Sequence, residues 1–411
     1  MATHRRVNVA SGRQLEQVAH YARAARVDDT VLLAGTTAID RAGNVRGAGD
    51  VAAQVDAIMA IAEWSLGKAG SGFHDVVRSR MYVTDVALAD AAGRAVAKYF
   101  HDVKPAATLV GVDALSRPEQ LIEIELDAVD GARGTRHRVS SGRALEDRWA
   151  YSRAVRVGDR VFVSGSSALN AQGAIEAPGD VYRQTRATLD TIFRAVAEAG
   201  GAREDIVYTK TYLTDRNATE PYTRAWLEAF GDVRPTSTLL GVPALVRPEM
   251  LVEIEAEAIV GAARTRRDIY TEREREKPRG YARAVQVGDW IWVSGCTSIS
   301  AAGEIQAPGD WGAQADLAHE TIRWSLAQLG ASMDDVVRRC TFNVRGATRR
   351  PYGEGPAWFA KSCPASLGCT IAALARPEIV VEVEVAAVKG AGAKIEWIAP
   401  DAVDPLDRPR S

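Results

Sequence analysis

The amino-acid sequence predicts an α+β protein built from three tandem units, each a mixed β-sheet with two helices on one face. The first observation is an internal repeat: residues 151–165 match residues 281–295 at 10 of 15 positions, where chance would give about one. A third copy begins at Tyr21, so both offsets are 130 residues. The second observation is that strand-like and helix-like hydrophobic periods alternate in the same order within each copy.

Further landmarks keep the same register and set the unit boundaries. A Gly-Asp pair precedes each long helical pattern, and an Arg-Pro-Glu turn recurs after 130 and then 129 residues, at 117–119, 247–249 and 376–378. We therefore expect units at residues 5–130, 135–260 and 265–390, of which the first departs most from the common pattern. The remaining tail, 391–411, is rich in Pro and Asp, which is typical of a loose end.

The first half of the second copy predicts a hairpin and a long helix. Strand-like residues 154–157 and 161–164 flank Gly158-Asp159, a two-residue link that suits a type II′ turn. Asp180 offers an N-cap oxygen to the helix that follows. Its apolar residues recur at helical spacing until Gly200-Gly201 ends it, namely Leu189, Ile192, Phe193 and Val196.

The second half predicts a strand, a shorter helix and two more strands. The strand spans 206–213, and the helix places Tyr222 and Trp226 on one face and ends before Arg234-Pro235. In the last strand, 251–259, apolar side chains alternate with Glu253, Glu255 and Glu257, so the two kinds point to opposite faces. The helices cover one sheet face, and the other two units are the nearest cover for the second.

Composition narrows the function classes. The net charge of −2 provides no general attraction to nucleic acid or to an anionic membrane. Neither a membrane-spanning segment nor a signal peptide is evident, so we expect a cytoplasmic protein. The four cysteines lack zinc-site spacing, and we expect neither a metal nor another cofactor.

The repeated motifs resemble the Rid family, also called YjgF or reactive intermediate deaminase proteins. They are the run YxRAVxVGDxxxVSG, the YLTD at 212–215 and the segment RPTSTLLGVPALVRPEMLVEIEA at 234–256. The resemblance implies a chorismate-mutase-like fold and three units with ligand clefts at their interfaces. Because all three units lie in one chain, we expect a monomer with internal pseudo-three-fold symmetry.

The resemblance also implies an activity, the hydrolysis of reactive enamines and imines such as 2-aminoacrylate. Deaminating members carry a carboxylate-binding arginine where this sequence has Ala107, Ser237 and Ser366. Its loss removes a contact of about 1.5 to 3 kcal/mol. We therefore expect a small-molecule enzyme that hydrolyses or tautomerises an imine, an enamine or a small carboxylated metabolite. Specialised metabolism is one setting for such a reaction. The alternative is a non-catalytic ligand-binding protein; RNA cleavage, an older label for the family, is poorly supported by the net charge.

The candidate catalytic residues Glu123, Glu253 and Glu382 match the cleft glutamate of the family. A carboxyl group near apolar walls can have its pKa raised toward the working pH, as general acid/base chemistry requires. The alternative is that this strand face meets solvent or neighbouring arginines. We expect Glu123, in the most degenerate unit, to matter least.

The candidate substrate-binding residues surround these glutamates in the family pattern. Tyr21, Tyr151 and Tyr281 match a tyrosine that crosses the interface, and two residues later stand Arg23, Arg153 and Arg283. These arginines either replace the missing clamp or pair with Glu16, Glu146 and Glu276. Arg117, Arg247 and Arg376 are second-ranked anion contacts or surface turns. The strand-end corner supplies Ser164, Ser166, Ser294 and Cys296, the last either a nucleophile or a packed thiol.

Overall fold

The computed structural model describes residues 4–271, 276–351 and 354–408. The first unit contains β1 (Arg6–Val9), α1 (Gln14–Val18), β2 (Ala24–Val27), β3 (Thr30–Thr36), α2 (Val51–Lys68), β4 (Val76–Val83), α3 (Ala89–Phe100), β5 (Ala106–Gly111) and β6 (Ile122–Val129). The second contains α4 (Ala132–Thr135), β7 (His137–Val139), α5 (Ala144–Arg148), β8 (Ala154–Val157), β9 (Arg160–Ser166), α6 (Val181–Glu198), β10 (Ile206–Leu213), α7 (Thr219–Phe230), β11 (Thr236–Gly241) and β12 (Val252–Ile259). The third contains β13 (Arg267–Ile269), β14 (Ala284–Val287), β15 (Trp290–Cys296), α8 (Trp311–Gln328), β16 (Val336–Val344), β17 (Ala365–Ile371) and β18 (Val381–Val388), and β19 (Ile395–Ile398) follows.

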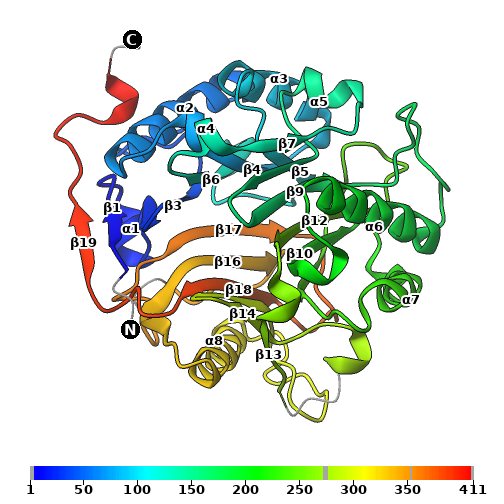
Figure 1. The fold of residues 1–411 in the computed structure, drawn as a ribbon. Coiled ribbons are helices and arrows are strands. Elements are labelled where there is room, and N and C mark those ends of the chain that lie inside the picture. The colour runs from blue at the N-terminus through cyan, green and yellow to red at the C-terminus, as the bar shows by residue number, and fades with distance from the viewer. Residues whose placement is uncertain (1–3, 272–275, 352–353, 409–411) are drawn as a thin grey trace.

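Each unit forms one mixed sheet with the same strand order. In the second unit the order is β11-β10-β12-β9-β8-β7, and the third repeats it. The pair β10 and β11 is parallel, whereas the other neighbours are antiparallel. The long helices lie outside and the sheets inside, as Figure 1 shows.

The predicted elements of the second unit agree with the structure. Gly158 has φ +61°, as the first central residue of a type II′ turn requires. The Asp180 side chain accepts a hydrogen bond from the Arg183 amide and so caps α6. On β12, the apolar residues Val252 and Ile254 pack with the helices in one core.

The inner faces of the three sheets share a second core. Its large side chains include Tyr82, Tyr212 and Phe342, one from each unit. Equivalent backbone contacts join the units in cyclic order, at Ala106 with Ser152, at Pro235 with Ala282, and at Ala365 with Ala22. The first unit therefore contacts the second, the second the third, and the third the first.

Charged side chains occupy part of this interior. We call them the central charge cluster; it comprises Arg78, Arg80, Glu125, Asp127, Arg160, Lys210, Glu255, Glu257, Arg338 and Glu384. Arg80 Nε lies 2.7 Å from Glu255 of the second unit, and Lys210 Nζ lies 2.7 Å from Glu384 of the third. The Glu face of the last strand thus meets arginines and a lysine from the neighbouring unit, rather than solvent.

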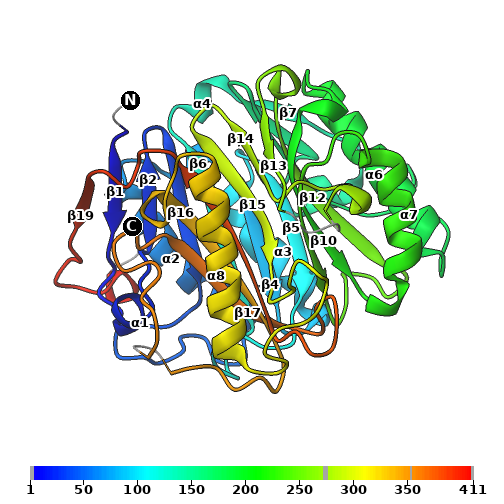
Figure 2. The same ribbon diagram turned by 90° about the horizontal axis from the view of Figure 1, so that it is seen from below.

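The third unit differs from the prediction of two helices per sheet. Its long helix α8 lies across the outer face of the sheet (Figure 2), but the described residues between β16 and β17 form no second α-helix. The reason lies in the sequence there, where Gly346, Pro351, Gly355 and Pro356 interrupt any helical run.

The tail is also different from the predicted loose end. Strand β19 pairs in parallel with β1 and extends the first sheet to seven strands. Beyond it, Asp401 accepts hydrogen bonds from Trp64 Nε1 (2.8 Å) and Lys68 Nζ (2.6 Å), and Asp404 lies 3.3 Å from Arg13. Apolar and charged contacts with the first unit therefore order a segment whose composition alone suggests disorder.

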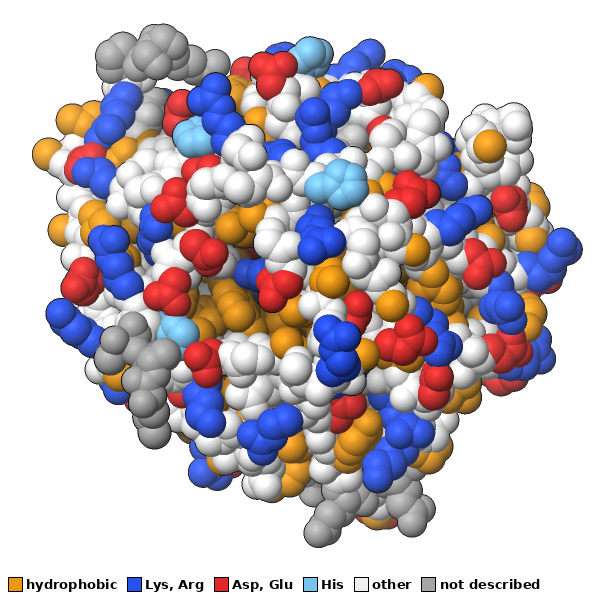
Figure 3. All heavy atoms as spheres, in the orientation of Figure 1, with side chains coloured by type: hydrophobic (Ala, Val, Ile, Leu, Met, Phe, Trp, Pro, Cys, Tyr) orange, Lys and Arg blue, Asp and Glu red, His pale blue; other side chains and the backbone are white. Residues whose placement is uncertain are grey.

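The described residues contain neither a membrane-spanning helix nor a cluster of metal ligands. No described helix has both the length and the apolar character to cross a membrane. Within the same part of the chain, no group of three or more His, Cys, Asp or Glu side chains is placed to hold a metal ion. On the face shown in Figure 3, acidic and basic side chains are interspersed.

Candidate functional site

The three candidate glutamates lie where one unit meets the next. Glu123, Glu253 and Glu382 stand on β6, β12 and β18, and only 6 to 7% of each is exposed. Each carboxyl lies against a strand-end glycine of its own unit, namely Gly35, Gly165 and Gly295. A Cβ at any of these glycines would overlap a carboxyl oxygen, so only glycine fits beside the acid.

Burial is the main cause of a large pKa shift at all three acids. It raises the pKa of Glu123 and Glu253 to about 8 and that of Glu382 to about 7. Neighbouring carboxylates add to the shift, and arginines such as Arg153 oppose it. Each group can therefore hold a proton near neutral pH and release it, as an acid/base catalyst must.

At the first junction, between the first and second units, polar groups join the two. Ser164 Oγ accepts a hydrogen bond from the Ala107 amide at 2.8 Å, and the Gly165 amide donates to Thr108 Oγ1 at 3.1 Å. The second junction, between the second and third units, repeats these contacts. Ser294 Oγ accepts from the Ser237 amide, and the Gly295 amide donates to Thr238.

The third junction, between the third and first units, has lost both hydroxyls. Ala34 stands where the others have serine, and Leu367 stands where they have threonine. The Leu367 side chain instead packs against Gly35, beside Glu123. The corner beside Glu123 therefore lacks the hydroxyl contacts of the other two junctions, in agreement with the divergence of the first repeat.

The arginines two residues after the tyrosines are fully engaged in structural contacts. Arg153 donates to Glu146 (3.2 Å), to the Gly165 carbonyl (2.8 Å), to Ser166 Oγ (3.1 Å) and to Tyr151 Oη (3.0 Å). Arg23 and Arg283 make the equivalent ion pairs with Glu16 and Glu276. This arrangement supports the ion-pair interpretation and leaves these guanidinium groups poorly placed to bind a substrate.

Two of the candidate tyrosines lie where two units meet. Tyr151 packs with the hydrophobic core of the first unit, and Tyr21 packs with Val337 and Ala365 of the third. Burial raises the pKa of Tyr151, and Glu253 of its own unit contributes to that rise. Backbone groups that cross the junctions come from β5, β11 and β17 of the preceding unit.

The remaining predicted residues have various surroundings. Cys296 is fully buried, and its Sγ lies 3.3 Å from Arg283 Nη1 and 3.2 Å from the Ser294 carbonyl. Arg117 and Arg247 donate to the carbonyls of Gly43 and Gly173 in surface loops, and Arg376 is exposed. The contacts of Arg117 and Arg247 are those of the surface-turn interpretation.

Sequence reasoning missed two cationic residues near candidate glutamates, Arg349 near Glu123 and Arg216 near Glu382. Arg216 follows β10, donates to the Leu374 carbonyl of the third unit at 3.3 Å, and lowers the pKa of Glu382 electrostatically. The equivalent position in the first unit is Val86, so Arg216 does not repeat and the comparison of copies passes over it. The signal in the sequence was that a charged residue follows the YLTD segment of the second unit, where the first unit has valine.

Two cavities lie away from the glutamates. One of about 380 Å³ lies beside α6 on the surface of the second unit, and a much smaller one of about 30 Å³ lies within the central charge cluster. Neither is lined by Glu123, Glu253 or Glu382.

Comparison with known proteins finds the same unit three times. The family model described as endoribonuclease L-PSP matches residues 11–130, 141–260 and 273–389. An uncharacterised protein of Streptomyces coelicolor is 37% identical over 125 residues, which cover 30% of this chain and 92% of the relative. The 3-aminoacrylate deaminase RutC of Acinetobacter baylyi is 32% identical over 110 residues, or 27% and 86% of the two chains.

One solved structure is similar to a single unit of this chain. The crystal structure of Rv2704 from Mycobacterium tuberculosis, a member of the YjgF/YER057c/UK114 family, is 38% identical and has a TM-score of 0.28. The match covers 31% of this chain and 100% of that one. Because three consecutive matches, one for each sheet, span most of the sequence, the chain belongs to the YjgF or Rid family and carries three copies of its unit.

Proposed function

We propose that this protein is a small-molecule enzyme whose reaction is catalysed by junction glutamates acting as acid and base. The observation that carries the proposal is the pKa of Glu253 and Glu382, raised by burial to about 8 and about 7. Such groups exchange protons readily at neutral pH. The substrate class is an imine, an enamine or a small carboxylated metabolite, in keeping with the RutC relative, a 3-aminoacrylate deaminase.

The chemistry needs only a proton donor, a proton acceptor and water. A protonated glutamate donates its proton to the carbon of an enamine, which becomes an iminium. The resulting carboxylate then accepts a proton from a water molecule, and the oxygen of that water bonds to the iminium carbon. Transfer of the new hydroxyl proton to the amine and loss of ammonia then leave a carbonyl product. If the carboxylate instead takes a proton from the iminium nitrogen, the enamine is tautomerised to an imine.

Among the three junctions, we favour the second. It retains both cross-junction hydroxyls, at Ser294 and Thr238, and it adds the Arg216 guanidinium near Glu382. A guanidinium favours carboxylate partners through charge-assisted hydrogen bonds. Arg216 would then supply the anion contact that Ser237 cannot.

The test is a panel of enamine and imino acids, generated in place and followed by ammonia release, with the single variants Glu123→Gln, Glu253→Gln and Glu382→Gln. Glutamine keeps the size but cannot accept the proton, so turnover should fall by about 10² to 10⁴ at the working junction. Glu123→Gln should have the smallest effect. Three near-wild-type rates would contradict the proposal.

The alternative function is ligand binding without catalysis. It is favoured by the burial of the three glutamates, each of which is only 6 to 7% exposed. Mass spectrometry of the purified protein would identify a retained metabolite. A ligand released unchanged after long incubation, together with no turnover of the panel, would establish the binding function.

A further inference from the structure

The tail fills a groove on the first unit that stays open on the second. On the first unit, β19 lies beside β1, and the chain then crosses α2 to the loop at 39–46. On the second unit, β7 is the outermost strand of its sheet, and nothing described pairs with its free edge. The two units have the same fold here, so the first unit serves as a template for the second.

Two equivalent positions show this difference directly. A Cβ on Gly12 would lie 3.1 Å from Pro400 of the tail, whereas a Cβ on Gly142 would meet nothing within 4 Å. Along the helix, Trp64 is 8% exposed beneath the tail, whereas Trp324, at the same position of the third unit, is 39% exposed. The tail thus covers a surface that the other units leave open.

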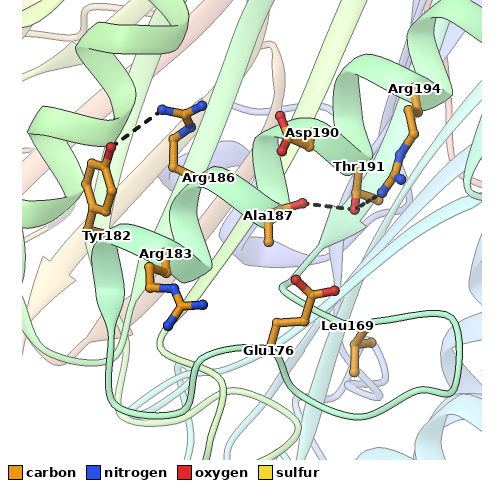
Figure 4. A pocket seen from close by; sticks show the side chains of 9 residues that line it. All are labelled: Leu169, Glu176, Tyr182, Arg183, Arg186, Ala187, Asp190, Thr191 and Arg194. Atoms are coloured by element: carbon orange, nitrogen blue, oxygen red, sulfur yellow. Dashed lines mark hydrogen bonds between the residues drawn. The ribbon is translucent and has the colours of Figure 1, made fainter.

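The open groove of the second unit contains the cavity of about 380 Å³. Figure 4 shows Leu169 and Glu176 entering from the loop and Arg183, Asp190 and Arg194 from α6. These lining positions correspond, 130 residues earlier, to the positions that the tail crosses. The cavity therefore lies where the tail would run if the second unit had one.

A buried cation beside this groove has an unfilled hydrogen-bonding position. Arg143 is 9% exposed, and its Nη1 is buried without a hydrogen-bond partner among the described residues. Its counterpart Arg13 lies 3.3 Å from the carboxylate of Asp404 in the tail. Burial lowers the pKa of Arg143, and repulsion from other arginines, including Arg194, adds to the effect.

The charges around the groove define the occupant. Asp401 binds Trp64 and Lys68, whose counterparts are Arg194 and Glu198, and Asp404 binds Arg13, whose counterpart is Arg143. At the third position the charge is reversed. Arg46 of the first unit binds Asp407 at 2.8 Å, whereas the second unit has Glu176 at the equivalent position. We propose that the second unit binds an extended peptide segment of another protein along β7 and α6, with two acidic residues three positions apart and a basic residue three positions later.

The test uses the full-length protein and two fluorescent peptides. One has the tail sequence 394–408, KIEWIAPDAVDPLDR, and the other carries Asp407→Lys. The lysine peptide should bind about tenfold more tightly, because it replaces a repulsive contact with Glu176 by an attractive one. Replacing the two aspartates at positions 401 and 404 by alanine should abolish binding.

Protein variants locate the binding site. Glu176→Arg should reverse the preference between the two peptides, and Arg194→Glu should weaken both. Arg323→Glu, at an exposed arginine on α8, is the matched control and should change neither. A photo-crosslinker on the lysine peptide should mark α6, and thermal unfolding would verify that each variant is folded.

Three results would overturn the proposal. They are equal affinity of the two peptides, crosslinking to α2 with displacement of the protein's own tail, and an absence of binding at millimolar peptide. Preference for the native tail sequence at α6 would instead identify a second copy of this chain as the occupant, and it would also refute the proposed charge pattern.

Discussion

At each junction, a glycine without a Cβ leaves the space that a glutamate carboxyl occupies. Gly165 and Gly295 leave room for a glutamate carboxyl that any side chain would displace. We predict that Gly295→Ala reduces turnover at the second junction as strongly as Glu382→Gln, while the fold survives. Steady-state kinetics checks this, with Gly368→Ala as the control, because a Cβ there meets nothing within 4 Å.

The raised pKa values also predict how stability depends on pH. The folded protein keeps protons on these glutamates that the unfolded chain releases above about pH 4.5. Their contribution to stability is therefore fully present below that pH and is lost as the pH rises to about 8. Glu253→Gln removes one such group. The urea midpoint for unfolding of this variant should therefore fall less between pH 5 and pH 8 than the midpoint of the wild type. Parallel midpoint curves would show that Glu253 titrates normally.

Arg216 allows the second junction to be tested separately from the first. If it binds a substrate carboxylate, Arg216→Ala removes a charge-assisted contact of about 1.5 to 3 kcal/mol, and KM should rise about tenfold to a hundredfold. Val86→Ala, at the equivalent position of the first unit, should leave KM unchanged. A change in kcat alone would place the function of Arg216 elsewhere.

The absence of the family arginine makes a prediction of its own. With Ala107, Ser237 and Ser366 at those positions, hydrolysis of 2-aminoacrylate should be slow or undetectable beside a family member that has it. Ser237→Arg should then increase the rate, since Ser237 borders the second junction. Coupled ammonia detection would compare the three proteins; a fast wild-type rate would contradict the prediction.

Individual residues were predictable from sequence to different degrees. The repeat placed the glutamates and corner residues in register, because equivalent positions keep equivalent roles in three copies. It could not reveal Arg216, which occurs once. It also left open whether Arg153 binds substrate or Glu146, since only the folded backbone brings the Gly165 carbonyl to that guanidinium.

At the scale of elements, the second unit was predicted closely. Its hairpin, helix cap and strand 206–213 follow local rules, so they can be read from a short window. The tail could not be, because the groove that orders it belongs to residues more than 300 positions earlier. Composition describes a segment alone, whereas this segment is ordered by its partner surface.

The tail should therefore contribute measurably to the stability of the first unit. It covers Trp64, and Leu406 packs against the core of that unit. Removal of residues 395–411 should lower the free energy of unfolding by about 2 to 4 kcal/mol and shift the Trp64 emission to the red. Denaturant unfolding followed by tryptophan fluorescence checks both effects. An unchanged midpoint would mean that the contacts add nothing in solution.

For the whole molecule, the cyclic contacts predict the oligomeric state. Each unit already covers the inner sheet face of its neighbours, so no further copies are needed. We expect a monomer of 44.2 kDa by light scattering. A stable particle of about 130 kDa, three times that mass, would refute this prediction.

The central charge cluster explains how one order of units is specified. The cations of each unit face acids of the next, as Arg80 faces Glu255 and Lys210 faces Glu384. Separating one such pair leaves an uncompensated buried charge and costs about 3 to 5 kcal/mol. An arrangement with the units in another order would separate several of these ion pairs at once.

The parallel pairing of β19 with β1 has one more consequence, for local opening. Continuous chain spans the first and second junctions, through residues 130–136 and 260–266, whereas the third junction is spanned only by the segment that leads from β18 into β19. Strand β19 pairs with β1 at the edge of the first sheet. The third junction also lacks the serine and threonine hydroxyl contacts of the other two. Amide protons of β17 and β19 should therefore exchange with deuterium earlier than those of β5 and β11, because local opening should begin at the third junction, where the first and third units meet.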